Sequence, residues 1–401
     1  MRIIYKYLST CLIIGISGVP FLLNDTALII FFLFILIRVF ETKTKILWVE
    51  VLTVLAFAIF FCLQYYIYKN FSFMTLAGTI LRMLIGLFYL KVEGREFIPK
   101  YVKTMHYICL ISIIVYILFN LVTNLHEYVL QHAFRNAGEW NFTKTIFIYQ
   151  FSPINLVSRN IGPFWEPGIF GIFINLSLFF RLFVLKDKLN RTLLEIISVI
   201  TTFSTTNYLI LFVLLTFYYA IYSKHIIKLI YLLFAVTLFG FITLNSDFLF
   251  AKVATQIEEA KIEKVILNEG RFVSVIRDYK DFKKTWATGT GFSIKNRFYY
   301  SPWRTHSNCG FTDIVVKLGL LGSLVYFILL SRGISVILKY YSNGSGFLLN
   351  IILLVLIFLA GISEIVYSMS LFLGIVIIGS SKQTTYSLIS MSEGITENPA
   401  S

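Results

Sequence analysis

Charged residues are scarce in this 401-residue chain, where Asp, Glu, Lys and Arg together make up 14%. A soluble globular domain carries about 25% charged residues, so this shortage excludes an ordinary water-soluble protein. Only four cysteines occur, and three lie inside apolar runs, so neither a disulfide framework nor a zinc-binding spacing is present. The chain also lacks an H-E-x-x-H motif and an obvious carboxylate cluster, so we expect neither a metal nor another cofactor.

Apolar residues are correspondingly abundant. Hydrophobic residues make up 57% of the chain, and the mean hydropathy is +0.79. Lipid must therefore surround most of the chain, and we predict an all-α, polytopic integral membrane protein. The formal net charge is +14, but Lys and Arg are spread over short connectors between apolar runs. No compact basic domain is present to bind a phosphate backbone, which excludes nucleic acid as a partner.

Apolar runs long enough to cross about 30 Å of hydrocarbon recur along the whole sequence. We predict about twelve transmembrane helices in a single membrane domain over residues 1–401. The first run has a basic start but no small-x-small cleavage site, so we expect it to remain as an uncleaved span. The predicted spans are 5–23, 26–40, 46–68, 71–90, 104–124, 163–181, 192–203, 207–222, 226–244, 312–331, 346–361 and 365–380.

The distribution of Lys and Arg predicts the orientation. With a cytoplasmic N-terminus, eighteen of these residues lie in the inner segments and one lies in the short outer turns. This bias is a strong positive-inside signal. It places the loops at 125–162 and 245–311 outside and the polar tail at 382–401 in the cytoplasm. Long loops are translocated largely regardless of charge, so the basic residues in these two loops do not contradict the orientation.

The second long loop contains a segment with helical periodicity, "RFVSVIRDYKDFKKTW" (271–286). Apolar residues share one face of this segment and basic residues occupy the other. Such a helix lies on the membrane surface or caps a cavity, so we expect a large extracytoplasmic loop that is partly helical. The expected apolar face consists of Phe272, Val275, Ile276, Tyr279, Phe282 and Trp286.

Two charged residues stand at the head of the predicted span 163–181, in the stretch "SRNIGPFWEPG" (158–168). Glu166 precedes Pro167, and an acid before a first-turn proline is typical of a helix N-cap. The alternative is an acid held at the outer membrane face near a substrate. Arg159 either pairs with Glu166 or a lipid phosphate, or it has a functional role.

Three further candidates lie in the second outer loop. Arg271 heads the amphipathic segment, where binding to lipid headgroups is the alternative to a functional role. His306, in "SPWRTHSNCG" (301–310), is either a hydrogen-bonding loop residue or a functional imidazole. Arg304 has the same two interpretations.

Arg82 differs from these residues because it falls near the middle of the predicted span 71–90. An arginine at membrane depth almost always faces a polar cavity or a partner. A functional role is favoured for it, and a structural ion pair is the alternative. The charge count places the other candidates in one outer compartment, and Arg82 would reach the same cavity from within the bilayer.

Five stretches between residues 158 and 322 form an ordered set. They are Arg159 with "GPFWEPGIFGIF", "TTFSTTNYLILFVLL" (201–215), "GRFVSVIRDY" (270–279), "GTGFS" (289–293) and "HSNCGFTDIVVKLGLLG" (306–322). Their order and spacing resemble the O-antigen polymerase and ligase superfamily of bacterial envelopes, and its Wzy-type polymerases in particular. Asn207 departs from the family pattern, in which glycine is common after the Ser-Thr-Thr turn.

The resemblance implies a helical fold of the C-type glycosyltransferase (GT-C) kind in the bacterial inner membrane. Such proteins join sugar repeat units on undecaprenyl diphosphate at the outer face. An undecaprenyl-diphosphate-linked oligosaccharide is thus expected as both donor and acceptor, with a chain-length regulator protein as a further partner. Breaking a sugar–diphosphate bond develops negative charge that arginines stabilise without a metal. The expected diphosphate-binding residues are Arg159, Arg271, Arg82 and Arg304, and the expected base is Glu166 or His306.

Two alternatives remain open at this point. A ligase of the same superfamily would move finished polymer onto a lipid A core, with the same donor chemistry and a different acceptor. A flippase or other transporter of lipid-linked sugar belongs to another class, which often shows paired half-repeats with broken helices. No convincing symmetry relates the two halves of this sequence.

Overall fold

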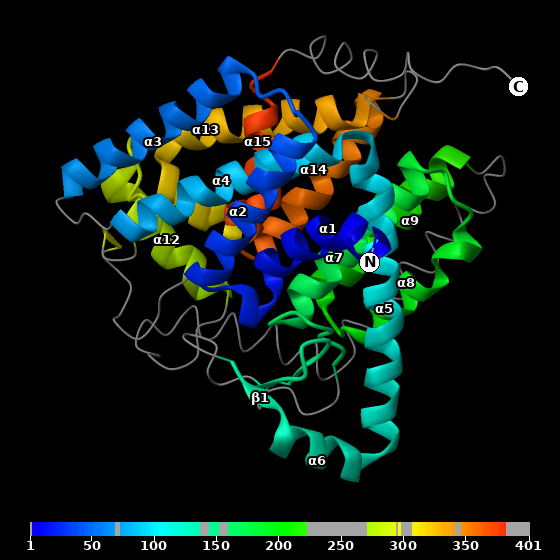
Figure 1. The fold of residues 1–401 in the computed structure, drawn as a ribbon. Helices are drawn as coiled ribbons and strands as arrows, with labels where there is room; N and C mark the ends of the chain where they lie inside the picture. The colour runs from blue at the N-terminus through cyan, green and yellow to red at the C-terminus, as the bar shows by residue number, and fades with distance from the viewer. Residues whose placement is uncertain are drawn as a thin grey trace, which may run out of the picture.

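A computed structural model describes residues 2–68, 73–136, 144–151, 159–222, 271–293, 296–297, 307–339, 341 and 346–381. This part of the chain is mainly α-helical and includes a small three-stranded sheet (Figure 1). The α-helices are α1 (Arg2–Gly18), α2 (Asp25–Glu41), α3 (Trp48–Tyr68), α4 (Phe73–Glu93), α5 (Phe97–Leu121), α6 (Thr123–His132), α7 (Pro167–Phe179), α8 (Leu193–Thr201), α9 (Thr205–Tyr222), α12 (Arg271–Thr285), α13 (Gly310–Lys339), α14 (Gly346–Ser363) and α15 (Ser370–Ile378). The strands are β1 (Phe134–Arg135), β2 (Lys144–Thr145) and β3 (Gln150–Phe151), and short 3-10 or π segments are η1 (Pro20–Leu22), η2 (Gly94–Glu96), η4 (Phe180–Val184), η5 (Leu189–Thr192) and η7 (Val366–Ser368).

Six helical stretches within these ranges are long and apolar enough to cross a membrane, which confirms a multi-pass membrane protein. One of them joins α4 and α5 through η2, where Gly94 adopts a φ of 46° and the chain turns (Figure 1). The other apolar helices, such as α1, α2, α8 and α15, are shorter. The predicted span at 226–244 lies outside the described residues. The six stretches are Trp48–Tyr68, Phe73–Leu121, Pro167–Val184, Thr205–Tyr222, Gly310–Lys339 and Gly346–Ser363.

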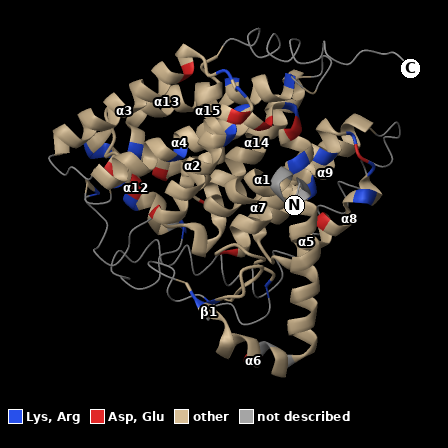
Figure 2. Cartoon of the chain, viewed as in Figure 1, with Lys and Arg blue, Asp and Glu red and all other residues tan. Residues whose placement is uncertain are grey.

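The outward faces of the long helices are apolar. On α3, exposed apolar residues recur every three or four positions and form a continuous stripe along one side of the helix. Long stretches of α3 and α5 carry no charge (Figure 2). A continuous apolar stripe of this length marks contact with lipid or a partner, and on helices that can span the membrane the contact is lipid. The stripe on α3 consists of Trp48, Leu52, Leu55, Ile59, Leu63 and Tyr66.

The core is built around α15, whose nine residues are all buried. This helix crosses α4 where Gly86 faces Ser370 and Gly374. A Cβ on Gly86 would overlap with the carbonyl oxygen of Ser370 and with the backbone of Gly374. Small residues allow two helix backbones in a membrane to approach this closely. The predicted span 365–380 is therefore a short helix enclosed by protein, preceded by η7.

Connectors that the sequence assigns to the same side of the membrane lie together. At one end of the protein, which we call the loop end, the Trp165 amide donates to the carbonyl oxygen of Gly18 at 3.1 Å, and the Asn160 amide donates to that of Thr201 at 2.8 Å. At the opposite end, the Tyr341 hydroxyl donates to the carbonyl oxygen of Arg95 at 2.6 Å. That the loop end faces outward remains a prediction from the Lys and Arg count.

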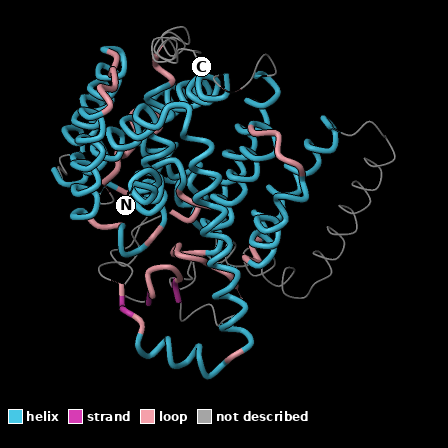
Figure 3. Tube along the Cα trace, turned by 45° about the vertical axis from the view of Figure 1, so that its right-hand side comes forward, coloured by secondary structure: helices cyan, strands magenta, loops and turns pink. Residues whose placement is uncertain are grey.

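The small sheet lies beside α6, beyond the end of α5 (Figures 1 and 3). Its strands are antiparallel in the order β1-β2-β3, with Thr145 opposite both Phe134 and Gln150. The buried Gln150 side chain donates to the Thr145 hydroxyl at 2.8 Å, and its backbone amide donates to the carbonyl oxygen of Gly162 at 2.8 Å. The sheet thus holds the segment that leads into α7. The sequence did not predict it, because strands of two residues leave no periodic pattern.

Helix α12 confirms the predicted helix in the second loop, but its burial differs from the simple amphipathic expectation. The side that packs into the protein is polar and contains Ser274, Asp278, Asp281 and Thr285. Ile276, Tyr279 and Trp286 of the predicted apolar face are exposed, and Phe272 lies outside the described side chains. In a membrane protein an apolar helix face meets lipid as readily as it meets the core, so periodicity alone does not say which face is buried.

Candidate functional site

Arg159 lies at the loop end, against the turn between α8 and α9. Its Nε donates to the carbonyl oxygen of Thr202 at 3.0 Å, and its Nη2 donates to that of Phe203 at 3.0 Å. Phe203 adopts a φ of 46°, in the left-handed region, so the chain turns sharply at the residue whose carbonyl oxygen accepts from Arg159. The stretch 201–207 therefore positions Arg159 through backbone oxygens, and two of the five N–H groups of the guanidinium are used in this way.

Helix α7 begins directly beside Arg159. Glu166 is the N-cap residue and Pro167 is the first helical residue, as predicted, but the Glu166 side chain makes no capping hydrogen bond. Glu166 is exposed. The start of the helix is held instead by Asn207, whose Nδ2 donates to the carbonyl oxygen of Gly168 at 2.9 Å. Since capping does not employ the Glu166 carboxylate, a purely capping role does not account for it.

Arg271 meets an acid that lies far from it in the sequence. Its Nη2 donates to Oε1 of Glu364 at 3.2 Å, across 93 positions of the chain. Glu364 follows the last residue of α14 and precedes η7. Its side chain is 8% exposed, whereas that of Arg271 is 31% exposed. The Arg271 guanidinium thus bridges a buried carboxyl group and the open loop end.

Two glycines make room for Glu364. A Cβ on Gly168 would overlap with Oε1 of Glu364, which places that carboxyl group against the first turn of α7. A Cβ on Gly310 would overlap with the carbonyl oxygen of Glu364, so the first residue of α13 packs against its backbone. Four elements therefore converge on this residue: α7, α12, α13 and the end of α14.

Arg159, Glu166, Arg271 and Glu364 are close enough to influence one another's charge, and we call them the Arg271–Glu364 cluster. Burial lowers the pKa of the Arg159 guanidinium, Glu166 opposes this shift, and Arg271 adds to it. The pKa of the Glu364 carboxyl is raised to about 8, because burial and, to a smaller extent, the negative charge of Glu166 raise it more than Arg271 lowers it. The cluster combines two cations with two carboxyl groups, one exposed and one buried.

A second group of charges, the Arg297 network, joins α12 to α13. Arg297 Nη1 lies 3.2 Å from Asp278 Oδ1 and 3.6 Å from Asp281 Oδ2, and Nη2 lies 2.6 Å from Asp313 Oδ1. Lys317 Nζ lies 2.5 Å from the other oxygen of Asp313. The side chain of Arg297 is only 5% exposed. Burial raises the pKa of Asp278, and Arg297 opposes that shift. This network fixes α12, and with it Arg271, on the first turns of α13.

The GTGF stretch (289–292) lies outside the helices, and its backbone pairs with that of a broken helix. Gly319 interrupts α13 with a φ of 66° and a ψ of −176°. The amides of Thr290 and Gly291 donate to the carbonyl oxygens of Val316 and Lys317 at 2.8 and 2.9 Å. Gln64 of α3 donates to the Lys317 oxygen at 2.8 Å. Backbone groups that a helix break leaves without helical hydrogen bonds need other partners inside a membrane protein. Here the second loop provides them.

The remaining predicted site residues stand apart from the cluster or outside the described ranges. Arg82 is half-buried in α4, and the charged residue that influences it is Asp25 at the start of α2. No described interaction joins Arg82 to Arg159, Arg271 or the two glutamates. Arg304 and His306 lie in the segment 298–306, which the structure does not describe, so their roles stay predictions.

Glu364 is the member of the cluster that sequence reasoning missed. It stands between two predicted spans, in a turn assigned to the outer side, and the resemblance to known polymerases ends before it at residue 322. The signal that would have found it is a lone acid in an outer turn of a chain poor in charge. Such a residue has few ways to be neutralised except by one of the outer arginines.

Charges at the opposite end form a separate group. His106 Nδ1 lies 2.9 Å from Glu195 Oε1, Arg181 also contacts Glu195, and Arg181 Nε lies 3.1 Å from Asp187 Oδ2. Their side chains bond mainly to one another. Among the described residues, no group of three or more His, Cys, Asp or Glu side chains is arranged to hold a metal ion.

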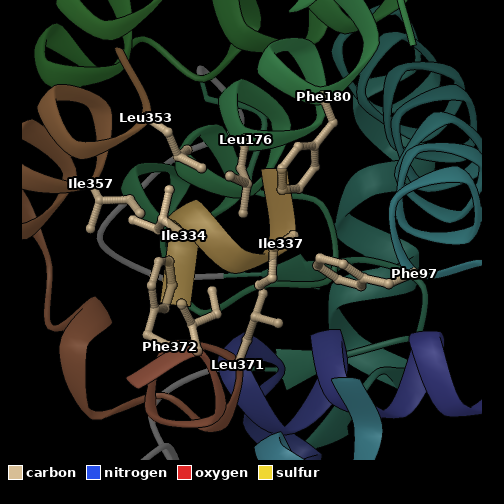
Figure 4. Close-up of a pocket in the computed structure, with 10 residues that line it drawn as sticks. Phe97, Leu176, Phe180, Ile334, Ile337, Leu353, Ile357, Leu371 and Phe372 are labelled. Carbon is tan, nitrogen blue, oxygen red and sulfur yellow. The ribbon is translucent and has the colours of Figure 1, made fainter. Parts of the chain in front are cut away.

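A small pocket lies within the helix bundle and has only apolar side chains around it (Figure 4). Phe97 and Phe180 line it from α5 and η4, and further side chains come from α7, α13, α14 and α15. No polar group of the Arg271–Glu364 cluster belongs to its lining. We interpret it as an imperfection of packing between crossing helices. The full lining is Phe97, Leu176, Phe180, Ile334, Ile337, Leu353, Ile357, Leu371, Phe372 and Ile375.

No protein-family model matches the sequence, and neither a curated protein nor a solved structure matches it. The functional argument therefore depends on the chemistry of the cluster itself. A half-exposed arginine beside a second arginine forms a site for a multiply charged anion. Two carboxyl groups at the same place allow one proton to be accepted and another to be donated.

Proposed function

We propose that the protein is a polymerase of undecaprenyl-diphosphate-linked oligosaccharide repeat units. It transfers the growing glycan from one lipid diphosphate to the terminal sugar of another at the outer face of the bacterial inner membrane. The observation that supports this proposal is the convergence of Arg159, Glu166, Arg271 and Glu364 at the loop end. A membrane-embedded sugar diphosphate needs cations for its leaving group and a carboxylate for its acceptor, and this cluster contains both.

In this proposal Arg159 and Arg271 hold the diphosphate. Each guanidinium stays charged and offers a planar fork that suits phosphate oxygens. Glu166 is our first choice of base because its exposed carboxylate stands at the head of α7, where a polar acceptor sugar arrives from the aqueous side. His306 is the second choice. Arg82 and Arg304 would add further cations, and their contribution rests on the resemblance.

The proposed topology has about twelve spans in a GT-C-like arrangement, with both termini in the cytoplasm and the loop end facing the periplasm. The Lys and Arg count supports this orientation. Labelling of single cysteines introduced at positions 159 and 166 tests it. A reagent that does not cross the inner membrane should modify both positions in intact spheroplasts. Labelling that requires permeabilised spheroplasts would contradict the proposed enzyme.

Reconstitution tests the reaction directly. The purified full-length protein in liposomes should convert synthetic undecaprenyl-diphosphate repeat units into a ladder of longer products without added metal. Transfer of a preformed polymer to lipid A core without any ladder would identify a ligase instead. Movement of labelled lipid-linked sugar across the bilayer without new glycosidic bonds would identify a transporter.

The substitution Glu166→Gln tests the proposed base. It should leave the protein folded in the membrane, because the side chain is exposed and glutamine has nearly the same size and shape. It should collapse long polymer to single repeats, with a rate loss of about a hundredfold, since general base catalysis contributes roughly that much. Glu41→Gln, an exposed acid at the opposite end, is the matched control and should give normal polymer. Normal chain lengths in Glu166→Gln would remove Glu166 from the mechanism.

A further inference from the structure

Glu166 and Glu364 belong to one cluster, but they differ in burial and in hydrogen bonding, two properties that control protonation. Glu166 is exposed and stands at a helix start. Glu364 has a side chain that is 8% exposed, lies against the first turn of α7, and receives one hydrogen bond from Arg271. Pairs of carboxyl groups whose environments push their protonation apart are the usual acid and base of an enzyme.

The position of Glu364 relative to Arg271 matters as much as its burial. The hydrogen bond to Glu364 uses one N–H of Nη2, and a guanidinium has five N–H donors in a planar fork. A phosphate oxygen that binds the same fork lies next to the Glu364 carboxyl group. Arg271 is 31% exposed, so such an oxygen can reach it from the loop end.

We infer that Glu364 is the proton donor of the transfer, which makes it a catalytic residue that the sequence motifs do not contain. This inference rests on the proposed polymerase reaction and adds a second proton transfer to it. The acceptor hydroxyl oxygen forms the new bond to the anomeric carbon and gives its proton to Glu166. The anomeric C–O bond to the diphosphate breaks, its electron pair stays on the phosphate oxygen, and that oxygen takes the proton from Glu364. After the product leaves, Glu166 releases its proton to solvent and Glu364 takes one up from solvent.

The charges that face Glu364 favour its protonated form at neutral pH. Its pKa is raised to about 8, because burial and Glu166 raise it more than Arg271 and the Ser363 hydroxyl lower it. A bound diphosphate engages Arg271 and so removes the counter-charge of Glu364. The carboxyl group then holds its proton until the leaving oxygen becomes basic enough to take it.

The direction of the pH dependence follows from this assignment. The donor form of Glu364 is present below a pH of about 8 and is lost as the pH rises through that value. The polymerisation rate of the wild-type protein should therefore fall above pH 8, and the logarithm of the rate should decline with pH as expected for the loss of a single proton. Inorganic pyrophosphate should also bind less tightly above pH 8, because the ionised carboxylate competes for Arg271.

The experiment measures initial rates of polymerisation between pH 6 and about pH 9.5 with the reconstituted full-length protein. Glu364→Gln keeps the shape of the carboxyl group but cannot donate an acidic proton. Its rate at pH 7 should be lower by about a hundredfold, and its profile should lack the alkaline decline. Glu364→Asp should keep the decline with a reduced rate. Glu41→Gln is the control and should reproduce the wild-type profile.

Pyrophosphate binding separates a lost proton donor from a lost fold. Glu364→Gln should bind pyrophosphate at least as tightly as the wild-type protein at pH 7, and the ratio of the two affinities should grow in favour of Glu364→Gln at about pH 9. An active wild-type protein together with an unchanged rate or an unchanged alkaline decline in Glu364→Gln would overturn the assignment of Glu364 alone. A wild-type protein that makes no polymer at any pH would overturn the proposed function, and the assignment with it.

Discussion

Two arginines of the same loop meet their acids in opposite ways. Arg297 is 5% exposed and contacts three aspartates, which also bond to neighbouring hydroxyls and Lys317. Arg271 is 31% exposed and donates one hydrogen bond to a single buried glutamate. A network that satisfies its arginine with buried carboxylates has a structural role, because removal of one partner leaves an uncompensated buried charge. An arginine that lies beside an acid but still has exposed N–H donors is suited to bind a substrate.

The largest expected effect comes from breaking the Arg297 network. Arg297→Ala removes the cation that three buried aspartates share, and loss of one partner from a buried ion pair costs about 3–5 kcal/mol. We expect a large fall in the thermal unfolding temperature of the detergent-purified protein, or failure to accumulate in the membrane. An unfolding temperature like that of the wild-type protein would show that the network does not hold α12.

Arg271→Ala should separate activity from stability. Loss of one donor to a developing oxyanion lowers the rate by about a hundredfold or more, so polymer should nearly disappear. The unfolding temperature should change little, because Glu364 without its arginine keeps its proton and stays neutral. A destabilisation as large as that of Arg297→Ala, with normal activity in the folded fraction, would reverse the comparison.

Substitutions at the two glycines beside Glu364 should also separate a loss of stability from a loss of activity, with smaller effects. A Cβ on Gly310 meets backbone, so Gly310→Ala should destabilise the protein by about 1–3 kcal/mol. A Cβ on Gly168 meets the movable end of Glu364, so Gly168→Ala should displace that carboxyl group from Arg271 at less cost in stability. We expect slower polymerisation in Gly168→Ala than in Gly310→Ala when rates are expressed per folded molecule. The reverse order would indicate that the position of the carboxyl group is unimportant.

The smallest effect is expected at the exposed side of α12. Lys283 Nζ lies 4.7 Å from the centre of the Tyr279 ring, and an exposed cation–π contact is worth about 0.5–1 kcal/mol. Lys283→Ala should therefore lower the unfolding temperature slightly and leave the polymerisation rate unchanged. The same measurements on Arg297→Ala provide the scale. A strong loss of activity would mean that this side of α12 takes part in the reaction.

The sequence predicted the parts of the fold that depend on local pattern. Spans such as 46–68 and 346–361 match α3 and α14 within a few residues, and the helix starting at Arg271 is present. Glu166 occupies the predicted N-cap position. Each of these features depends on neighbouring residues alone, namely on a run of apolar side chains or on a proline after an acid.

The parts that the sequence did not predict depend on contacts between distant segments. Arg271 and Glu364 are 93 positions apart, and no pattern in either segment points to the other. The buried side of α12 was not predictable, because its aspartates become neutralised only when Arg297 folds back onto them. Periodicity identifies a two-faced helix but not the neighbours of each face.

The close contact between Gly289 and Gly319 limits which substitutions the sequence can accept during evolution. Gly289 and Gly319 adopt φ values of 69° and 66°, and a Cβ on either would overlap with the backbone of the other. A change at one position therefore cannot be repaired by a change at the other. The exposed lysines of α12, Lys283 and Lys284, have no such constraint and can vary, whereas this pair cannot. A search for remote relatives should therefore give the two glycines more weight than those lysines.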